Sequence, residues 1–414
     1  DFMNVLSVFD GMSCGQIALI ELGFKIDKYY AAEIDKHAIT QTQHNFPDTI
    51  QLGDVTKVKA KDLPKIDLFI GGSPCQGFSF AGKQLNFDDP RSALFFEFVR
   101  IWREVKKINP NAKFLLENVN MKKEYLRVIS EYLGVFPVRI NSNLVSAQNR
   151  DRWYWSNIKT KNVGLFAELW TDIPQPEDKG ILLKDILLPE SEVPDKFILS
   201  EKLLNSFLNK PGDFGQRFKP QIDEINPKAA CLTANVHKIQ VTGDFICVAM
   251  RGRNPENPSD RRTGSPTEQR LEPKTDGKTN CLTSVSKDNL IMTKNYLQLK
   301  GGFDSDNRFY KGDSKHAACL TKGQDKTGYF DGYKLRRLTP IECARLQTIP
   351  EWYEWIVSDT QIYRMLGNGW TVEVIKHIFS FLNGFEKTNV GGQKNKLRSN
   401  STNVHLKNEC STCG

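Results

Sequence analysis

The sequence predicts an α/β fold built on an open, mostly parallel sheet with helices on both faces. Three observations favour this class. Short β-rich runs alternate with amphipathic segments over residues 1–158, turns with glycine or acidic residues follow several of these runs, and helical periodicity returns near residue 331. Ligands of such sheets bind on the loops after the carboxyl ends of the strands, so a site is expected at those turns.

Strands are predicted over residues 5–9, 29–33, 67–70 and 113–117, where β-branched, aromatic and other apolar residues cluster. Helices are predicted between them over residues 16–22, 36–45 and 94–107, and later over 339–347 and 370–382. The composition changes near residue 160, where Pro, Gly, Asn and Asp become frequent. Residues 159–330 are therefore expected to form an inserted, smaller β-rich domain within a domain made of 1–158 and 331–385.

A short repeat and a polar tail mark the second half of the chain. Cys-Leu-Thr recurs at residues 231, 281 and 319, with spacings too uneven for a solenoid, so each copy is expected to be one short strand of a small core. Residues 386–414 are rich in Asn, Ser, Lys and Gly and are predicted to be disordered. Cys410 and Cys413 are close together, but too few further ligands lie nearby for zinc, and no metal site is expected.

The composition limits the class of protein. The chain has 414 residues, 39% hydrophobic and 26% charged, which is ordinary for globular domains. No apolar run approaches the ~18 residues that a membrane span needs, and no signal peptide is recognisable, so a cytoplasmic protein is expected. Nine scattered cysteines argue against a disulfide framework. The net charge of +8 suits an anionic partner, although many proteins with such a charge have none.

A cofactor site is predicted from one glycine loop and two acids. The loop from Phe9 to Gly15 follows the first strand, and its spacing is not that of a dinucleotide-binding loop. Glu33 ends the next strand, where it could accept hydrogen bonds from ribose hydroxyls, and Asp54 could hold an adenine amino group. Together they favour an adenosine cofactor without a diphosphate, of which S-adenosylmethionine is the common one.

Cys75 has the setting of a nucleophile. A lone cysteine is usually an inert buried side chain, which is expected for Cys14, Cys247 and Cys343. Cys75 instead lies in a sharp Gly-Gly-Ser-Pro-Cys-Gln-Gly loop after a strand. Glu117 ends another strand, and the alternation of a strand would point Arg150 and Arg152 to one side. Nearby cations favour the thiolate, and the absence of a paired histidine argues against a cysteine protease.

These motifs closely resemble the DNA cytosine-5 methyltransferase family. The resemblance covers residues 1–158 and 334–383 and includes Pro74-Cys75-Gln76, Glu117-Asn118-Val119, Gln148-x-Arg150-x-Arg152, residues 337–347 and Gln361-x-Tyr363-x-x-x-Gly367-Asn368. It implies a Rossmann-like S-adenosylmethionine-dependent methyltransferase fold with an inserted target-recognition domain. The chain departs from the bacterial members at Gly367-Asn368-Gly369-Trp370, where they usually have Gly-Asn-Ser-Val. A tryptophan at this position resembles the sequences of the vertebrate de novo branch.

The resemblance also implies roles for particular residues. Cys75 would add to carbon 6 of a flipped-out cytosine, Glu117 would assist at N3, Arg152 would contact the carbonyl oxygen, and Arg150 would support this geometry. S-adenosylmethionine, leaving as S-adenosylhomocysteine, would be bound by Phe9, Asp10, Gly11, Met12, Cys14, Gly15, Glu33, Ile34, Asp54, Val55, Pro74, Leu94, Asn368 and Trp370. Contacts to substrate DNA would come from Ser73, Pro74, Gln76, Ser79, Arg91 and Val119.

Double-stranded DNA is the expected partner of a monomeric, bacterial or phage-encoded enzyme in a prokaryotic cytoplasm. A cognate restriction endonuclease would act separately. Within the insertion, one arginine-rich segment is the candidate DNA-binding loop, and it contains Arg251, Arg253, Arg261 and Arg262. The alternative interpretation, that this segment is an ordinary solvent-exposed charged loop, has comparable weight.

Two other functions were weighed against DNA methylation. One family branch acts on tRNA with the same catalytic residues, but its insertion is short, whereas this one is long. A catalytically inactive DNA-binding relative is disfavoured because Cys75, Glu117, Arg150 and Arg152 are all intact.

Overall fold

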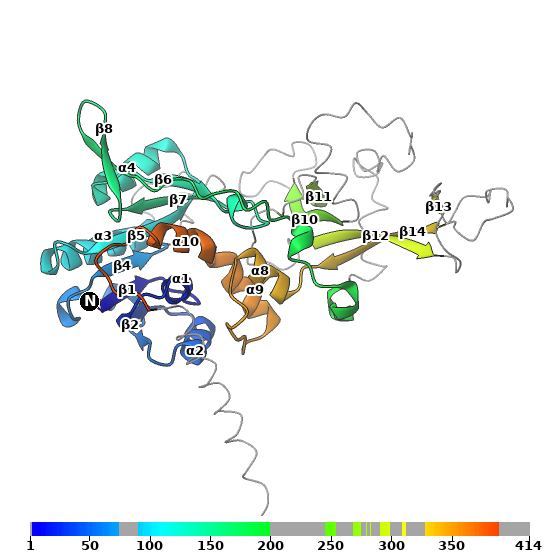
Figure 1. Cartoon of the computed structure of the whole chain (residues 1–414), viewed down its shortest axis with the longest axis horizontal. Coiled ribbons are helices and arrows are strands. Elements are labelled where there is room, and N and C mark those ends of the chain that lie inside the picture. Colours follow the sequence, from blue (N-terminus) through cyan, green and yellow to red (C-terminus); the bar gives the residue numbers. More distant parts are fainter. Residues whose placement is uncertain are drawn as a thin grey trace, which may run out of the picture.

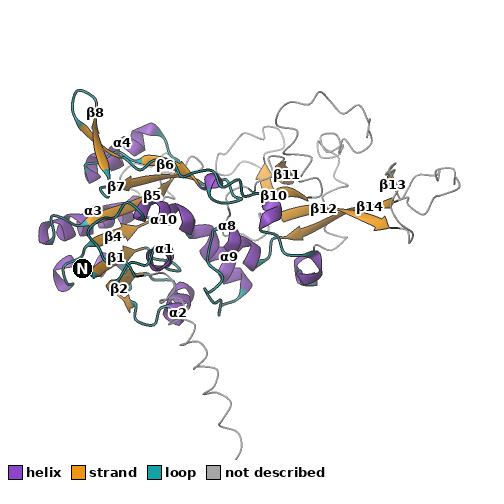
Figure 2. Cartoon of the chain, viewed as in Figure 1, coloured by secondary structure: helices purple, strands orange, loops and turns teal. Residues whose placement is uncertain are grey.

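The computed structural model describes residues 2–73, 90–198, 245–253, 268–274, 279, 282, 290–298, 309–311 and 328–388. Figure 1 shows two sheets set apart along the long axis of the molecule, with α8 (Pro340–Leu346) and α9 (Asp359–Asn368) between them. Helices gather around the sheet that contains the first strands, whereas strands dominate the other end (Figure 2). Among the described helices, none is long and apolar enough to span a bilayer.

The larger sheet has seven strands in the order β3-β2-β1-β4-β5-β7-β6. Their bounds are β1 Met3–Val8, β2 Ile26–Ala32, β3 Ile50–Gln51, β4 Leu68–Gly71, β5 Lys113–Val119, β6 Val138–Asn141 and β7 Asp151–Ser156. The first five run parallel, and β7 lies antiparallel between β5 and β6. The predicted mostly parallel sheet is confirmed, and all four predicted strands are present with ends that differ by no more than three residues.

Alternating side chains of the central strands build two cores, one on each face of the sheet. Met3 and Val5 of β1 belong to one cluster and Leu6 and Val8 to the other. The first cluster includes residues of α1 (Cys14–Glu21), α2 (Lys36–Asn45) and α10 (Val372–Phe379). The second includes α3 (Pro90–Ile108) and α4 (Lys123–Leu133). Because side chains alternate along a strand, strands buried on both faces need helices on both.

Local signals explain where several helices begin. The Asp35 side chain accepts a 2.9 Å hydrogen bond from His37 N at the start of α2. Thr339 and Glu342 form a reciprocal capping box at the start of α8, and Pro340 occupies its first turn. The predicted helix over 36–45 matches α2, and the others match within a few residues. α9 has no counterpart among the predicted helices.

The smaller sheet has five strands in the order β11-β10-β12-β14-β13. Their bounds are β10 Phe245–Arg253, β11 Glu268–Lys274, β12 Leu290–Gln298, β13 Phe309–Lys311 and β14 Gly328–Arg337. β14 pairs with β12 up to Arg337. The smaller sheet therefore extends past residue 330, where the insertion is predicted to end. The hairpin of β8 (Thr160–Val163) and β9 (Glu168–Thr171) lies beside the larger sheet (Figure 1), where Trp170 stacks on Phe136 at 4.8 Å.

Other predictions fall partly on described residues. Cys14 and Cys343 are buried free thiols, as expected. Of the three Cys-Leu-Thr copies, the structure describes only Leu282, which is buried in a core; Thr279, two residues before the middle copy, is also described. Residues 386–388, at the start of the predicted disordered tail, are paired with the chain: Thr388 N donates to Gly23 O at 2.7 Å. Residues 389–414, including Cys410 and Cys413, lie outside the described residues.

Candidate active site

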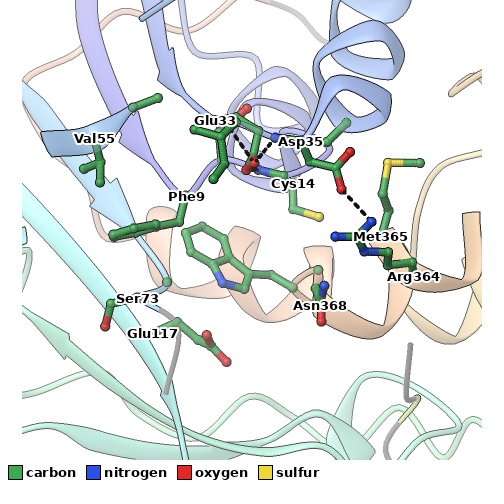
Figure 3. A pocket seen from close by; sticks show the side chains of 18 of the residues that line it. Phe9, Cys14, Glu33, Asp35, Val55, Ser73, Glu117, Arg364, Met365 and Asn368 are labelled. Carbon is green, nitrogen blue, oxygen red and sulfur yellow. Dashed lines mark hydrogen bonds and ion pairs between the residues drawn. The ribbon is translucent and has the colours of Figure 1, made fainter. Parts of the chain in front are cut away.

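A cavity of about 820 Å³ opens at the carboxyl ends of β1, β2, β4 and β5. The strand order turns back between β1 and β4, and ligands of open α/β sheets bind at such a point. Figure 3 shows Glu33 and Val55 toward one end of this cavity and Ser73 and Glu117 toward the other. The volume is in the range of small-molecule sites.

The loop after β1 has an unusual backbone. Phe9 and Ser13 adopt left-handed conformations with φ of 58° and 62°, and Gly11 lies between them at 60°. A left-handed residue other than glycine costs about 1–3 kcal/mol and persists only where the surroundings hold it. Here Gly11 N donates to Glu33 Oε2 at 2.8 Å, and the Tyr353 hydroxyl donates to Met12 O at 3.0 Å. The loop is thus held from β2 and from the C-terminal part of the chain.

Glu33, directly after β2, faces the cavity with a fixed carboxylate. Its Oε1 accepts hydrogen bonds of 2.8 Å from Ile34 N and Asp35 N, and its Oε2 accepts the bond from Gly11 N. A carboxylate offers about four acceptor positions, so about one remains for a ligand hydroxyl. Beside it the Ile34 side chain is 73% exposed and provides an apolar surface for a flat ring. This combination fits a nucleoside.

Asp54 follows β3 and caps the short turn Val55–Lys57. Its Oδ1 accepts from Thr56 N at 2.9 Å and from Thr56 Oγ1 at 2.8 Å. These two hydrogen bonds, the backbone one first, lower the pKa of Asp54, so the group is ionised at neutral pH and suits an amino group. Asp54, Glu33, Asp10 and Ser73 follow β3, β2, β1 and β4 in the order of the sheet, over roughly 14 Å at 4.8 Å per strand. An extended adenosine-amino acid cofactor fits this row.

Glu117 and Arg152 form a buried ion pair at the other end of the cavity. Arg152 Nε lies 2.9 Å from Glu117 Oε1, and the two side chains are 14% and 10% exposed. The pair is held by the antiparallel ladder of β5 and β7, which places Val119 opposite Arg152. An alanine Cβ at Gly72 would lie 3.2 Å from Glu117 Oε2, so this glycine leaves the carboxylate its space.

Arg150 lies just before β7 and is only 4% exposed. Its guanidinium donates to Gly367 O at 3.2 Å and to Gly369 O at 2.7 Å. These bonds tie the β7 side of the cavity to the end of α9, where Asn368 and Trp370 also line it. Arg150 and Arg152 line the same cavity, although Arg150 lies before the first residue of β7.

Most predicted site residues that the structure describes line this one cavity. They are Phe9, Asp10, Gly11, Cys14, Glu33, Ile34, Asp54, Val55, Ser73, Leu94, Glu117, Val119, Arg150, Arg152, Asn368 and Trp370. Met12 and Gly15 do not line it: Met12 is 1% exposed in the core, and a Cβ at Gly15 would meet Ile70 at 2.4 Å. Both residues support the wall from behind.

Several predicted residues lie outside the described part of the chain. These are Pro74, Cys75, Gln76, Ser79, Arg261 and Arg262. The backbone is described for Arg91 in α3 and for Arg251 and Arg253 in β10, without their side chains. Roles assigned to all of these residues remain predictions.

The sequence analysis missed the rim of the cavity formed by α2 and α9. Arg364 of α9 forms an ion pair with Asp35, the cap of α2, with 3.2 Å between Nη1 and Oδ2 (Figure 3). Met365 lines the cavity beside it. Arg364 falls among the unspecified positions of the Gln361–Asn368 motif, so only a helix prediction there could have shown that it faces the cavity.

A doubly wound sheet with an acid after β2 and a nucleoside-sized cavity at its switch point defines the class of Rossmann-like enzymes that use an adenosine cofactor. Comparison with known proteins narrows this class. A sequence model described as C-5 cytosine-specific DNA methylase matches residues 3–383.

Individual relatives agree with that match. The chain is 30% identical to the Type II methyltransferase M.HgiCI of Herpetosiphon aurantiacus, over 91% of this chain and 96% of the relative. It is 28% identical to the orphan methyltransferase M.SPRI of Bacillus phage SPR, over 92% and 97%. Among solved structures, a DNMT2 mutant of Spodoptera frugiperda superposes with a TM-score of 0.52 at 18% identity, over 92% of this chain and 100% of that one, which supports the fold.

The chain belongs to the C-5 cytosine-specific DNA methylase family. It is an S-adenosylmethionine-dependent methyltransferase that acts on carbon 5 of cytosine in DNA, as the motifs predicted.

Proposed function

We propose that Cys75, Glu117, Arg150 and Arg152 carry the methylation of a cytosine that is flipped out of duplex DNA. The observation that supports this most is the Glu117–Arg152 ion pair, which lies in the same cavity as the nucleoside-type acid Glu33. Cys75 follows Ser73 by two residues in the sequence, and Ser73 lines that cavity at the end of β4. The base and the cofactor would therefore meet in one enclosed space.

Carbon 5 of cytosine is a poor nucleophile, so the ring has to be activated first. In the proposed reaction the Cys75 thiolate bonds to carbon 6, the displaced ring electrons reach N3, and N3 takes a proton from the protonated form of Glu117. Carbon 5 is then electron-rich and takes the methyl group from the sulfonium of S-adenosylmethionine, which leaves as S-adenosylhomocysteine. Water takes the carbon 5 proton, the double bond forms again as the Cys75 thiolate leaves carbon 6, and N3 returns its proton to Glu117.

The two arginines have different tasks in this proposal. Arg152 holds the Glu117 carboxylate through the 2.9 Å ion pair and faces the cavity, where it would contact the base carbonyl oxygen. Arg150 bonds the carbonyls of Gly367 and Gly369, so it would fix the wall that Asn368 and Trp370 share with the cofactor. Charged groups that are already oriented in this way can stabilise the transition state without having to reorient during the reaction.

S-adenosylmethionine, when bound, supplies an electrophilic methyl group on a sulfonium. Asp54 and Ile34 would hold the adenine and Glu33 the ribose, and the loop of Phe9, Asp10 and Gly11 would lie against the amino acid part. This assignment follows the order of these residues along the sheet edge, which ends at Ser73 and the catalytic side.

DNA would approach from the side of the smaller sheet. A base inside a duplex cannot enter a cavity of this kind, and extruding it costs a few kcal/mol. Ser73 and Val119 line the cavity and would contact the extruded nucleotide, together with Gln76, Ser79 and Arg91. The smaller sheet, with Arg251 and Arg253 on β10, would serve as the target-recognition domain.

The Cys75→Ser variant tests the assignment. A serine hydroxyl is far less nucleophilic, so transfer of labelled methyl groups to duplex DNA should vanish while the affinity for S-adenosylmethionine stays within about twofold. Cys343→Ser, which alters a buried thiol of the core, is the matched control and should remain active. Methylation of duplex DNA by Cys75→Ser, or transfer to tRNA alone by the natural chain, would contradict the proposal.

The cellular setting is a separate proposal. We infer a monomer in a prokaryotic cytoplasm, with a cognate restriction endonuclease acting separately. One relative is named a Type II methyltransferase and another an orphan methyltransferase, so the relatives differ on the last point. Light scattering of the purified chain at micromolar concentration should give the mass of one copy, and a dimer mass would contradict the monomer.

A further inference from the structure

Asp10, in the loop after β1, is a carboxylate held by two hydroxyl donors. The Tyr29 hydroxyl donates to Asp10 Oδ1 at 2.8 Å, and the Ser13 hydroxyl donates to Oδ2. Asp10 lines the cavity, whereas Tyr29 on β2 is 2% exposed and reaches Asp10 from inside the core. Its hydroxyl would lie 3.4 Å from a Cβ at Gly15, so the first turn of α1 closes over it.

The position of Asp10 along the sheet edge indicates which part of the cofactor it meets. Glu33 follows β2, Asp10 follows the neighbouring β1, and Ser73 follows β4 on the other side of β1. With the ribose at Glu33 and the methyl acceptor beyond Ser73, the amino acid part of the cofactor lies over the β1 loop. That part carries the cationic sulfonium and amino groups, which a carboxylate would attract.

We propose that Tyr29 is a positioning residue for cofactor binding, whose hydroxyl keeps the Asp10 carboxylate ionised and oriented toward the cationic end of S-adenosylmethionine. The inference rests on the proposed assignment of this cavity to the cofactor. Tyr29 touches neither the cofactor nor the base, so it acts only through Asp10.

The electrostatics of the loop agree with this geometry. Burial raises the pKa of Asp10 to about 6, while the hydrogen bonds from Ser13, Ser7 and Tyr29 act in the opposite direction and the nearby Glu33 adds to the rise. Burial also holds the pKa of the Tyr29 hydroxyl well above its usual range, so the phenol stays a donor throughout. The thiol of Cys14, whose pKa burial raises to about 12, stays neutral beside them.

The direction of the pH effect follows. A cation binds better to ionised Asp10 than to the protonated form. The affinity for S-adenosylmethionine is therefore highest above the pKa of Asp10 in the free protein and falls as the pH decreases through about 6. The dissociation constant should rise about fourfold between pH 7.5 and pH 5.5. Without the Tyr29 hydroxyl the carboxylate loses a donor that favours its ionised form, so the midpoint moves to higher pH.

The test is isothermal titration of the full chain with S-adenosylmethionine, without DNA, from pH 5.5 to 8.5. For Tyr29→Phe we expect the midpoint to move up by about one pH unit, with affinity about threefold weaker at pH 6.5 and nearly natural at pH 8.5. Asp10→Asn should bind weakly with no dependence on pH in this range. An unchanged midpoint in Tyr29→Phe, or a natural profile in Asp10→Asn, would overturn the proposal.

Three further variants test whether the shift of the pH midpoint is specific to the Tyr29 hydroxyl. Tyr30→Phe alters the neighbouring tyrosine, which packs on the opposite core, and should leave the profile unchanged. Tyr353→Phe removes the bond to Met12 O, so it should weaken binding equally at all pH values. His37 also lines the cavity, so His37→Asn is a further control and must keep the natural midpoint.

Methyl transfer by the natural chain is measured in the same preparations. Failure of transfer would contradict the proposed function, whereas the binding profiles test Tyr29 independently of it.

Discussion

Among the described residues, the Glu117–Arg152 pair is one of two well-buried ion pairs, and unlike the other, Arg336–Glu342, it lines the cavity. Its side chains are 10% and 14% exposed, whereas those of the helical pair Arg127–Glu131 are 73% and 61% exposed. An exposed pair contributes at most about 1 kcal/mol, and a pair withdrawn from water is costly unless its geometry is used. At the residue scale, a buried pair beside a cavity is therefore better explained by chemistry than by stability.

This difference gives a prediction for Glu117→Gln. The amide keeps the shape but can neither pair with Arg152 nor take part in proton exchange at N3, so methyl transfer should fall about 10²- to 10⁴-fold. Affinity for S-adenosylmethionine should change little. Single-turnover transfer of labelled methyl groups to duplex DNA measures the effect, and Glu131→Gln, from the exposed pair, is the control. Equal activity of the two variants would refute the role of Glu117.

Residues at strand ends could be predicted from the sequence, and residues that act across the chain could not. Glu33 and Glu117 follow apolar runs, and parallel strands bring their carboxyl ends to one edge. Arg364 lies on a helix that was not predicted. The carbonyl partners of Arg150, at Gly367 and Gly369, come from more than two hundred positions away, and no local pattern encodes such a pairing.

At the scale of elements, β14 and α8 are joined by a buried charge pair. Arg336 Nη1 and Nη2 donate to the two oxygens of Glu342 at 2.9 and 2.8 Å, and these side chains are 4% and 0% exposed. Glu342 also accepts from Thr339 N in the capping box and from Leu188 N. The Glu342 carboxylate thus holds together β14, the start of α8 and the loop that contains Leu188.

Arg336→Leu should destabilise the protein strongly, because it leaves the Glu342 carboxylate buried without its cation. We expect the free energy of unfolding to fall by about 3–5 kcal/mol in chemical denaturation. Arg127→Leu, at the exposed pair, should change it by less than about 0.5 kcal/mol. Adding Glu342→Gln to Arg336→Leu should recover part of the loss. A small effect of Arg336→Leu would mean that the two elements are held by other contacts.

The predicted helices include α2 but not α4 or α9, although both of these are amphipathic. α2 was matched because its cap and polar face are local features. β7 follows an irregular stretch, and its antiparallel insertion between β5 and β6 depends on partners that the sequence does not order. β14 runs from Gly328 to Arg337 and so crosses residue 330, where the insertion is predicted to end.

For the molecule as a whole, Gln148 joins the end of α8 to the segment that contains Leu282. Its side chain is fully buried, donates to Leu346 O at 2.8 Å and Gln347 Oε1 at 3.0 Å, and accepts from Leu282 N at 3.0 Å. Thr279 pairs with the same segment through its backbone. Thr279 and Leu282 thus pair with the segment that leads into Arg150 and Arg152.

Gln148→Met should therefore affect both parts of the molecule. Methionine has a similar size but cannot meet these partners, and each buried polar group left without a bond costs about 1–3 kcal/mol. We expect a lower melting temperature, and methyl transfer that falls more than cofactor affinity does, because Arg150 lies two residues away. Gln175→Met, at an exposed amide bonded to Arg139 O, is the control. An unchanged melting temperature of Gln148→Met would show that the Gln148 hydrogen bonds do not stabilise the protein.

Bisulfite sequencing directly tests cytosine-5 methylation of DNA with Cys75 as the nucleophile. DNA is taken from cells that express the natural chain or Cys75→Ser. We expect cytosines resistant to conversion at one recurring sequence with the natural chain and none with the variant. Full conversion of the DNA with the natural chain, or equal resistance with both, would contradict it.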